Sequence, residues 1–380
     1  PLSHHSLSPV DRGNPTEAAH FPSNRFPSPI MPTSPIFDRC TLSSLTRITN
    51  LDRTSFTVEK RPSSEWDTGD YVVGIVTDTS GHRAIELPSG RDMEVAEGDA
   101  VVGAFGTRQA TLEMTGSWRS IGNDGTMHAL TRAGLFGHVE SRSTLVQRPV
   151  ELRYYGHVRR NRESVTMKTA VDPVEEQPFT TPTVLFVGTS MSAGKTSAAR
   201  IVTRRLKRMG LSVLGAKVSG AGRYRDVLSI QDAGADWGVD FVDAGLPSTV
   251  VPEDEYRTAI RQLLSRLAQP PADVAVVEIG ASPLEPYNGA VAVEELQEAL
   301  AMTVLCASDP YAVIGVEEAF GMLSPDLVTG IATNTAAGVS LLNQLTDLPA
   351  FNIRDKETHD RLDALLRDRL GAAETPPDDS

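Results

Sequence analysis

The sequence predicts an α/β carboxyl-terminal domain with a mostly parallel sheet, preceded by a smaller, mostly-β barrel or sandwich domain. The chain has 380 residues, which suggests more than one domain. Short apolar runs separated by Gly and Asp occupy the first half of the sequence. In the second half, strand-like apolar runs alternate with helical segments, a rhythm that is typical of βαβ units.

The composition and the sequence pattern argue against a membrane-spanning, nucleic-acid-binding or secreted protein. Hydrophobic residues make up 40% of the chain and charged residues 22%, enough to form a buried core. No stretch approaches the roughly 20 apolar residues that cross a bilayer. The formal charge of -13 argues against a nucleic-acid partner. Cys40 and Cys306 form neither a disulfide framework nor a zinc-ligand pattern, and no secretory signal is evident. We therefore expect a cytoplasmic enzyme.

The first half of the chain divides into a polar leader and a β-rich domain. Residues 1–37 are rich in Pro, Ser, His and Asn and have no apolar period, so we expect a disordered leader. Residues 38–168 are expected to form the mostly-β domain, because turn signals separate short strand-like runs. The strands are predicted at 55–58, 71–76, 83–87, 100–105 and 138–140.

A Pro- and Glu-containing linker, 169–182, separates this domain from the α/β domain at 183–370, and a disordered tail is expected at 371–380. A strand is predicted at 183–187, where every residue after Thr183 is apolar, as in strands that are buried on both faces of a parallel sheet. Further strands are predicted at 211–216, 275–279, 302–307 and 328–332. Helices are predicted at 195–209, 253–267, 292–301, 313–322 and 336–345.

The strongest chemical signal lies between the first of these strands and the first helix. It is the run Gly188, Thr189, Ser190, Met191, Ser192, Ala193, Gly194, Lys195, Thr196 and Ser197. It matches the P-loop pattern except at the first position, where Thr189 stands in place of Gly, with Gly188 one residue earlier. Such a loop binds phosphate through backbone N–H groups and the helix N-terminus. Lys195 would reach the β- and γ-phosphates and Thr196 would contact Mg²⁺. The alternative is a Gly-capped turn with a solvent-exposed lysine.

Three further residues are candidates for the same site. Lys217 lies just past the second predicted strand, where a lysine could neutralise charge during phosphoryl transfer. Glu278 lies at the end of an apolar strand, the place of a Mg²⁺-ordering carboxylate. Asn334 follows the last predicted strand and could read a nucleotide base. The alternatives are a solvated lysine, a glutamate facing solvent and an Asn that caps the next helix.

Residues 188–196, Lys217 and Glu278 together resemble the dethiobiotin synthetase-like branch of P-loop NTPases, which also holds MinD-like ATPases and cobyrinate amidases. That branch begins its loop with Gly-Thr, as this chain does. The chain is similar, closer still, to a poorly characterised bacterial family that includes D-glutamate N-acetyltransferase-like proteins. The resemblance covers roughly residues 183–353, and the amino-terminal half does not look like the Rossmann-like domain usual in that family.

The resemblance implies a role for each matching residue. Lys195 and Thr196 would hold nucleotide phosphate and Mg²⁺, and Lys217 would match the substrate-side lysine of the synthetases. Glu278 would be the metal-coordinating carboxylate, and Asn334 would approximate the base-reading asparagine. The signature lysine of MinD-type loops is absent, because Ser190 stands in its place.

Three functions remain open from the sequence. The first is a Mg²⁺–ATP-dependent enzyme of the ligase, synthetase or kinase type, in which Lys195, Lys217 and Glu278 assist phosphoryl transfer to a small carboxylate-like substrate. The second is an N-acyltransferase whose loop holds the phosphates of an acyl-CoA. The third is a nucleotide-dependent regulatory or scaffold protein. We expect no nucleic-acid or membrane partner and leave a homodimer open.

Overall fold

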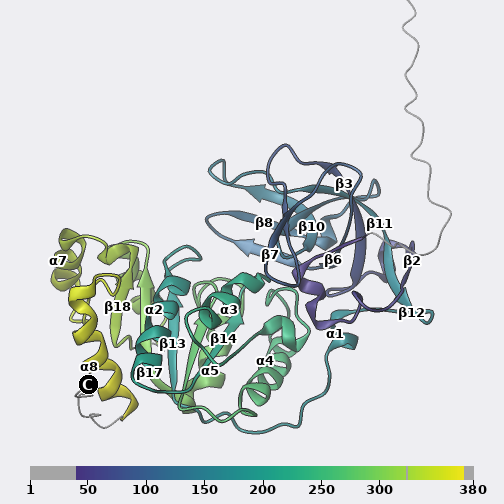
Figure 1. The fold of residues 1–380 in the computed structure, drawn as a ribbon. Helices are drawn as coiled ribbons and strands as arrows, with labels where there is room; N and C mark the ends of the chain where they lie inside the picture. Colours follow the sequence, from purple (N-terminus) through teal and green to yellow (C-terminus); the bar gives the residue numbers. More distant parts are fainter. Residues whose placement is uncertain (1–39, 322–323, 372–380) are drawn as a thin grey trace, which may run out of the picture. The chain divides into compact units, whose positions relative to one another are not determined.

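The computed structural model describes residues 40–321 and 324–371. The expected leader at 1–37, and the expected tail apart from residue 371, lie outside the described residues. Figure 1 shows a β-rich part, coloured purple to blue, and an α/β part, coloured teal to yellow. No helix within the described ranges is both long and apolar enough to cross a membrane.

Five strands of the β-rich part pair in a closed ring. Strand β6 pairs with β3, β3 with β11, β11 with β9, β9 with β10, and β10 again with β6. The last pairing is parallel and the other four are antiparallel, so ladder hydrogen bonds run around the whole ring. The strands are β1 (Thr41–Leu42), β2 (Thr57–Glu59), β3 (Tyr71–Asp78), β4 (Ala84–Glu86), β5 (Asp92–Glu94), β6 (Ala100–Phe105), β7 (Thr107–Ala110), β8 (Met114–Ser117), β9 (Thr126–Thr131), β10 (Leu135–Arg142), β11 (Glu151–Arg160) and β12 (Glu163–Ser164).

One apolar cluster lies wholly within the β-rich part. Val72, Phe105, Phe136 and Leu152, from four different strands of the ring, are each fully buried in it. After β12 the chain forms the short helix α1 (Met167–Ala170) and then continues without helix or strand to residue 182, across most of the expected linker.

The α/β part contains a six-stranded parallel sheet in the order β15-β14-β16-β13-β17-β18. Its strands are β13 (Thr183–Gly188), β14 (Val213–Ser219), β15 (Trp237–Asp240), β16 (Val274–Ile279), β17 (Leu300–Ala307) and β18 (Leu327–Gly330). Its helices are α2 (Lys195–Arg208), α3 (Tyr224–Gln231), α4 (Glu253–Leu267), α5 (Gly289–Leu296), α6 (Pro310–Ala319), α7 (Ala336–Leu345) and α8 (His359–Leu370). The mostly parallel α/β sheet predicted from the sequence is thus present.

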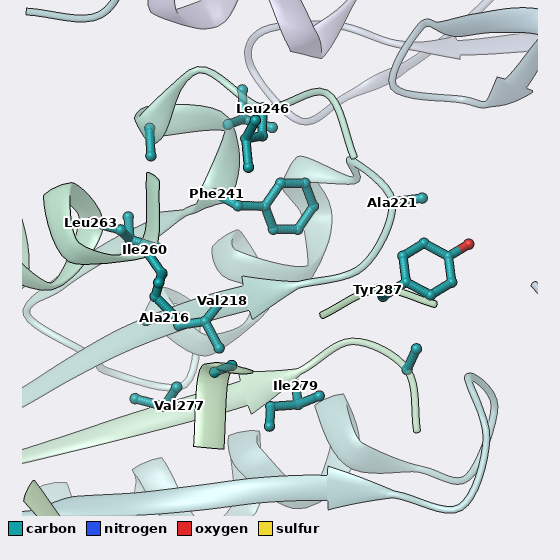
Figure 2. Packing of buried hydrophobic residues seen from close by; sticks show 14 of the residues in the cluster. Ala216, Val218, Ala221, Phe241, Leu246, Ile260, Leu263, Val277, Ile279 and Tyr287 are labelled. Carbon is teal, nitrogen blue, oxygen red and sulfur yellow. The ribbon is translucent and has the colours of Figure 1, made fainter. Parts of the chain in front are cut away.

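Helices cover both faces of this sheet (Figure 1). Along β13, Leu185 packs in the cluster that contains α4 and α5, whereas its neighbour Phe186 packs in the cluster that contains α2 and α8. Figure 2 shows the first of these clusters, with Ile260 and Leu263 of α4 close to Val218 of β14. Burial on both faces explains why β13 is apolar from Val184 to Val187.

Several predicted boundaries in the α/β part are wrong, among them the end of one helix and the end of one strand. The helix predicted at 292–301 ends at Leu296, and β17 already begins at Leu300, because the last residues of that segment pair with β13. Strand β14 extends to Ser219 rather than ending at Ala216, so Lys217 lies inside the strand and not past it. The physical reason is that β14 lies between β15 and β16 and pairs with both.

The β-rich and α/β parts belong to one compact unit and share a buried core. The guanidinium of Arg47, in the 3-10 helix Ser44–Ile48, donates to Asp240 at 2.7 Å and to Asp243 at 2.8 Å. The carboxylate of Glu86 accepts hydrogen bonds from the backbone N–H of Tyr224 at 2.8 Å and of Arg225 at 3.2 Å. Arg47 therefore pairs with the carboxylate at the end of β15. Glu86 caps the first turn of α3.

Candidate phosphate-binding site

The loop after β13 encloses the side chain of Lys195. Its ammonium group donates to the backbone carbonyls of Ser190 at 2.7 Å and Met191 at 3.3 Å, and the residue is only 2% exposed. Gly194 precedes the helix with φ +103°, a left-handed conformation that favours glycine. The lysine is therefore held inside the loop, and the alternative of a solvent-exposed lysine is wrong.

Gly188 gives the lysine its space. A Cβ at this position would lie 2.6 Å from Lys195 Nζ and 2.9 Å from the backbone O of Ser190. Thr189, which occupies the usual glycine position, attaches the loop to the end of β17. Its N–H donates to the carbonyl of Cys306 at 3.0 Å, and its hydroxyl accepts from the N–H of Ser308 at 3.0 Å. The residue that must be glycine here is therefore Gly188, which lies one position nearer to β13 than the glycine of the usual P-loop pattern.

A hydroxyl and a carboxylate meet beside this loop. Thr196, in the first turn of α2, donates to Glu278 Oε1 at 3.1 Å. The other carboxylate oxygen of Glu278 is buried without a hydrogen-bond partner among the described residues. Burial raises the pKa of Glu278, while attraction to Lys217 and Lys195 opposes the rise. The free oxygen beside a hydroxyl matches the donor set that Mg²⁺ uses in phosphate sites.

Sheet register places Lys217 beside Glu278. Lys217 pairs with Glu278 on β16 and with Asp240 on β15, so three charged side chains lie in one row across adjacent strands. The ammonium group of Lys217 forms an ion pair with Asp226 of α3. Burial alone would lower the pKa of Lys217, but attraction to Asp226 and Glu278 outweighs it and raises the pKa. This lysine is 5% exposed and stays charged, so the solvated alternative is wrong.

The protein side chains alone do not form a complete metal site. Within residues 40–321 and 324–371, no group of three or more His, Cys, Asp or Glu side chains is placed to hold a metal ion. Mg²⁺ is usually held by one or two protein groups together with substrate phosphates and water. Thr196 and Glu278 fit that kind of site, which requires a phosphate ligand in the loop.

Asn334 lines a small cavity at the other end of the loop. The cavity, of about 30 Å³, is also lined by Gly194, Asn352 and Arg354, and none of its described lining residues is a carboxylate. Arg354 donates to the hydroxyl of Ser197 at 3.1 Å, next to the loop. Asn334 does not cap the following helix, since Thr335 is the N-cap of α7. Its exposed amide remains near the loop.

The structure brings the predicted site residues together around one loop. Thr196, Lys217 and Glu278, with Met191 and Ser192 of the loop, line a second, larger cavity of about 420 Å³. The residues of the loop itself, as predicted, are Gly188, Thr189, Ser190, Met191, Ser192, Ala193, Gly194, Lys195, Thr196 and Ser197, and they run from the end of β13 into the first turn of α2.

Sequence reasoning missed the residues that the β-rich part adds to this cavity. Arg108 and Arg132 line it, and Glu113 accepts a hydrogen bond from the loop hydroxyl of Ser192 at 3.2 Å. These residues precede the loop by more than fifty positions in the sequence. No local motif marks them, so only the fold shows that they belong to the site.

Several solved structures are similar to about half of this chain. No protein-family model matches the chain, and no curated protein does. Among solved structures, the signal recognition particle receptor FtsY from Elizabethkingia anophelis is 14% identical with a TM-score of 0.33, covering 52% of this chain and 66% of that chain. The hydrogenase maturation factor HypB from Archaeoglobus fulgidus is 13% identical with a TM-score of 0.34, covering 50% and 90%. A DUF1611 family protein from Anabaena variabilis is 19% identical with a TM-score of 0.34, covering 51% and 61%. Similarities at these TM-scores carry no argument about function.

Proposed function

We propose that this protein is a Mg²⁺–ATP-dependent enzyme that transfers a phosphoryl group to a small carboxylate-like substrate, in the manner of the dethiobiotin synthetase-like branch. The single observation that carries the proposal is the arrangement of Thr196 and Glu278. A buried carboxylate oxygen without a partner is costly unless a cation occupies the space beside it. That oxygen lies next to a hydroxyl in the first turn of a helix that follows a phosphate-type loop.

The role of each residue follows from its position. The backbone N–H groups of the loop and the N-terminus of α2 would bind phosphate oxygens. Lys195 would exchange its two carbonyl acceptors for phosphate oxygens, a stronger charge-assisted contact. Thr196 and Glu278 would hold Mg²⁺, which supplies charge neutralisation for phosphoryl transfer. Lys217 would stabilise negative charge on the substrate side.

We propose ATP rather than GTP as the nucleotide. Guanine presents N–H donors on the edge where adenine presents an acceptor and an amino group, so a carboxylate favours guanine. The cavity beside Gly194 offers the amides of Asn334 and Asn352, and no carboxylate is among its described lining residues. Amide side chains both donate and accept and so pair with either purine; the lack of a carboxylate among the described lining residues is what favours adenine.

Calorimetric titration with ATP in the presence of Mg²⁺ tests the proposal. Wild-type protein should bind ATP, and Lys195→Ala should bind it at least about tenfold more weakly, since one charge-assisted contact is worth roughly 1.5–3 kcal/mol. Lys207→Ala is the matched control, because Lys207 lies on the same helix but pairs with Asp236 away from the loop. Unchanged affinity in Lys195→Ala, or binding of acetyl-CoA in place of ATP, would contradict the proposal.

Turnover is tested separately. Release of ADP should require both Mg²⁺ and a small carboxylate, and a panel of mono- and dicarboxylates identifies the class. ATP binding without ADP release in the presence of any member of the panel would contradict phosphoryl transfer and favour a regulatory protein. We also propose a homodimer, and a measurement of the mass of the protein in solution tests it.

A further inference from the structure

We propose that the β-rich part forms the anion-binding wall of the substrate site, in which Arg108 and Arg132 bind a carboxylate or phosphate group of the co-substrate opposite Lys217. This inference rests on the proposed function and assigns the co-substrate to one cavity. It also gives the β-rich part a direct role in binding, beyond attachment to the sheet.

The cavity beside the loop has walls from both parts of the chain. Arg108, Arg132 and His82 come from the β-rich part, and Thr196, Lys217 and Glu278 come from the α/β part. Its volume of about 420 Å³ suits a small metabolite. A molecule in this space would contact the arginines on one side and the proposed metal-binding pair on the other.

Arg108 is held beside the loop with part of its guanidinium free. Its side chain pairs with Glu113 and donates to the carbonyl of Leu130 at 2.7 Å. Glu113 in turn accepts from the hydroxyl of the loop residue Ser192. The Nε group of Arg108 is buried without a hydrogen-bond partner among the described residues. A buried N–H of a cation without an acceptor is a place where an anionic ligand gains binding energy.

Arg132 adds a second guanidinium to the same wall. Its guanidinium contacts Asp92 at 2.8 Å and His82 Nδ1 at 3.3 Å. Burial lowers the pKa of His82, and the charges of Arg132 and Arg108 lower it further, while Asp92 only partly offsets them. The positive charges of Arg132 and Arg108 therefore both lower the pKa of His82 at the cavity wall.

The arrangement selects an anion with planar or tetrahedral oxygens. A guanidinium presents parallel N–H donors that match the oxygens of carboxylate and phosphate. The α/β wall adds Lys217, which is charged, and Arg223, whose only described ion pair is a 3.8 Å contact with Asp226. A substrate anchored by its anionic group on the arginines would leave a second oxygen free to face Thr196 and Glu278.

NMR titration of His82 tests this inference without any turnover. An anion bound at Arg132 should raise the pKa of His82, because it offsets the positive charge that keeps the imidazole neutral. Succinate and inorganic phosphate are the probes, each compared with NaCl at the same ionic strength. The samples contain Mg²⁺ and a non-hydrolysable ATP analogue, so that the loop is filled and the probe reports on the cavity.

In wild-type protein we expect at least one probe to raise the pKa of His82 by about half a pH unit or more. The rise should be lost in Arg132→Gln and reduced in Arg108→Gln, each compared with its own probe-free value. It should persist in Arg153→Gln, which changes an exposed arginine outside the cavity. A response to succinate alone identifies a carboxylate substrate, and a response to phosphate alone identifies a phosphorylated one.

The outcomes separate this inference from the proposed function. If the ATP analogue binds, as calorimetry reports, but neither probe moves the His82 pKa, the anion wall is wrong and the nucleotide site stands. If the analogue fails to bind but the arginine-dependent rise of the His82 pKa appears, the nucleotide site is wrong and the anion wall stands. Equal probe responses in wild type, Arg108→Gln and Arg132→Gln, with amide spectra showing all three folded, would also overturn the inference.

Discussion

Replacement of Arg47 by Ala tests how the β-rich part is held to the α/β sheet. The Arg47 side chain is 9% exposed and that of Asp240 is 1% exposed, and their closest atoms are 2.7 Å apart. Arg47 also contacts Asp243 and lies over the ring of Tyr224 at 4.4 Å from its centroid. The substitution would leave the Asp240 carboxylate with a hydrogen bond from the Val242 N–H and the more distant attraction of Lys217, but with no ion pair to another described residue.

The expected loss is large because a buried charge would lose its counter-charge. Breaking a buried ion pair from one side costs about 3–5 kcal/mol, whereas an exposed pair contributes less than about 1 kcal/mol. The matched control is Arg261→Ala, since Arg261 pairs with Glu295 but is 54% exposed. We therefore expect Arg47→Ala to lower the free energy of unfolding by several times more than Arg261→Ala.

The loss should also depend on pH in a defined direction. Burial raises the pKa of Asp240 to about 6, against the attraction of Arg47, and repulsion from Asp243 adds to the rise. A carboxyl whose pKa is higher in the folded than in the unfolded state favours folding when protonated, and this contribution is lost as pH rises through the folded pKa. Without Arg47 the folded pKa rises further, so the penalty should be larger at about pH 8 than at about pH 5.

Urea unfolding followed by tryptophan fluorescence at these two pH values measures the effect. Trp237 lies on β15, the strand that ends at Asp240. A double variant that adds Asp240→Asn should recover part of the loss, because it removes the unpaired charge. A loss below about 1 kcal/mol at both pH values, or a loss that is greater at the lower pH, would refute the reasoning.

Further predictions concern the loop and its neighbours. Gly188→Ala should weaken ATP binding at least about tenfold by displacing Lys195, while lowering the free energy of unfolding by about 1–3 kcal/mol, as calorimetry and urea unfolding would show. Glu278→Gln should abolish the dependence of ATP affinity on Mg²⁺; a retained dependence would exclude the assigned metal role. Because burial raises the pKa of Glu278, Mg²⁺–ATP affinity should decline as pH falls through a value above the ordinary ~4.3, and this decline should be absent in Glu278→Gln. Asn334→Ala should weaken ATP binding but not tripolyphosphate binding, and equal losses would place the base elsewhere.

Local patterns were sufficient to predict several elements of the α/β part, including the helix that follows the loop. Helix α4 has the predicted bounds, and α2 ends one residue before the predicted end. The reason is that apolar periodicity and the Gly-Lys-Thr run act over a few residues. The sequence also predicted that Thr196 and Glu278 belong to one site. Thr196 follows one predicted strand and Glu278 ends another, and both therefore lie at the carboxyl edge of a parallel sheet.

Register and the contribution of the β-rich part could not be predicted in this way. Strand β11, ten residues long, was missed because its polar residues and Gly156 interrupt the apolar alternation. Lys217 was placed past its strand, although pairing with β15 and β16 keeps it inside. Arg108 and Arg132 lie near the loop only because the ring of strands packs against the α/β part. The proximity of these arginines to the loop depends on tertiary packing, which local sequence patterns do not predict.

An electron-density map of the protein crystallised with Mg²⁺ and a non-hydrolysable ATP analogue tests the central claim most directly. The account predicts terminal phosphates on the backbone amides of the loop, with Lys195 turned from the carbonyls of Ser190 and Met191 to a phosphate oxygen. It also predicts Mg²⁺ between the hydroxyl of Thr196 and the carboxylate of Glu278. Nucleotide bound elsewhere, or a bound nucleotide with Lys195 still on those two carbonyls, would contradict it.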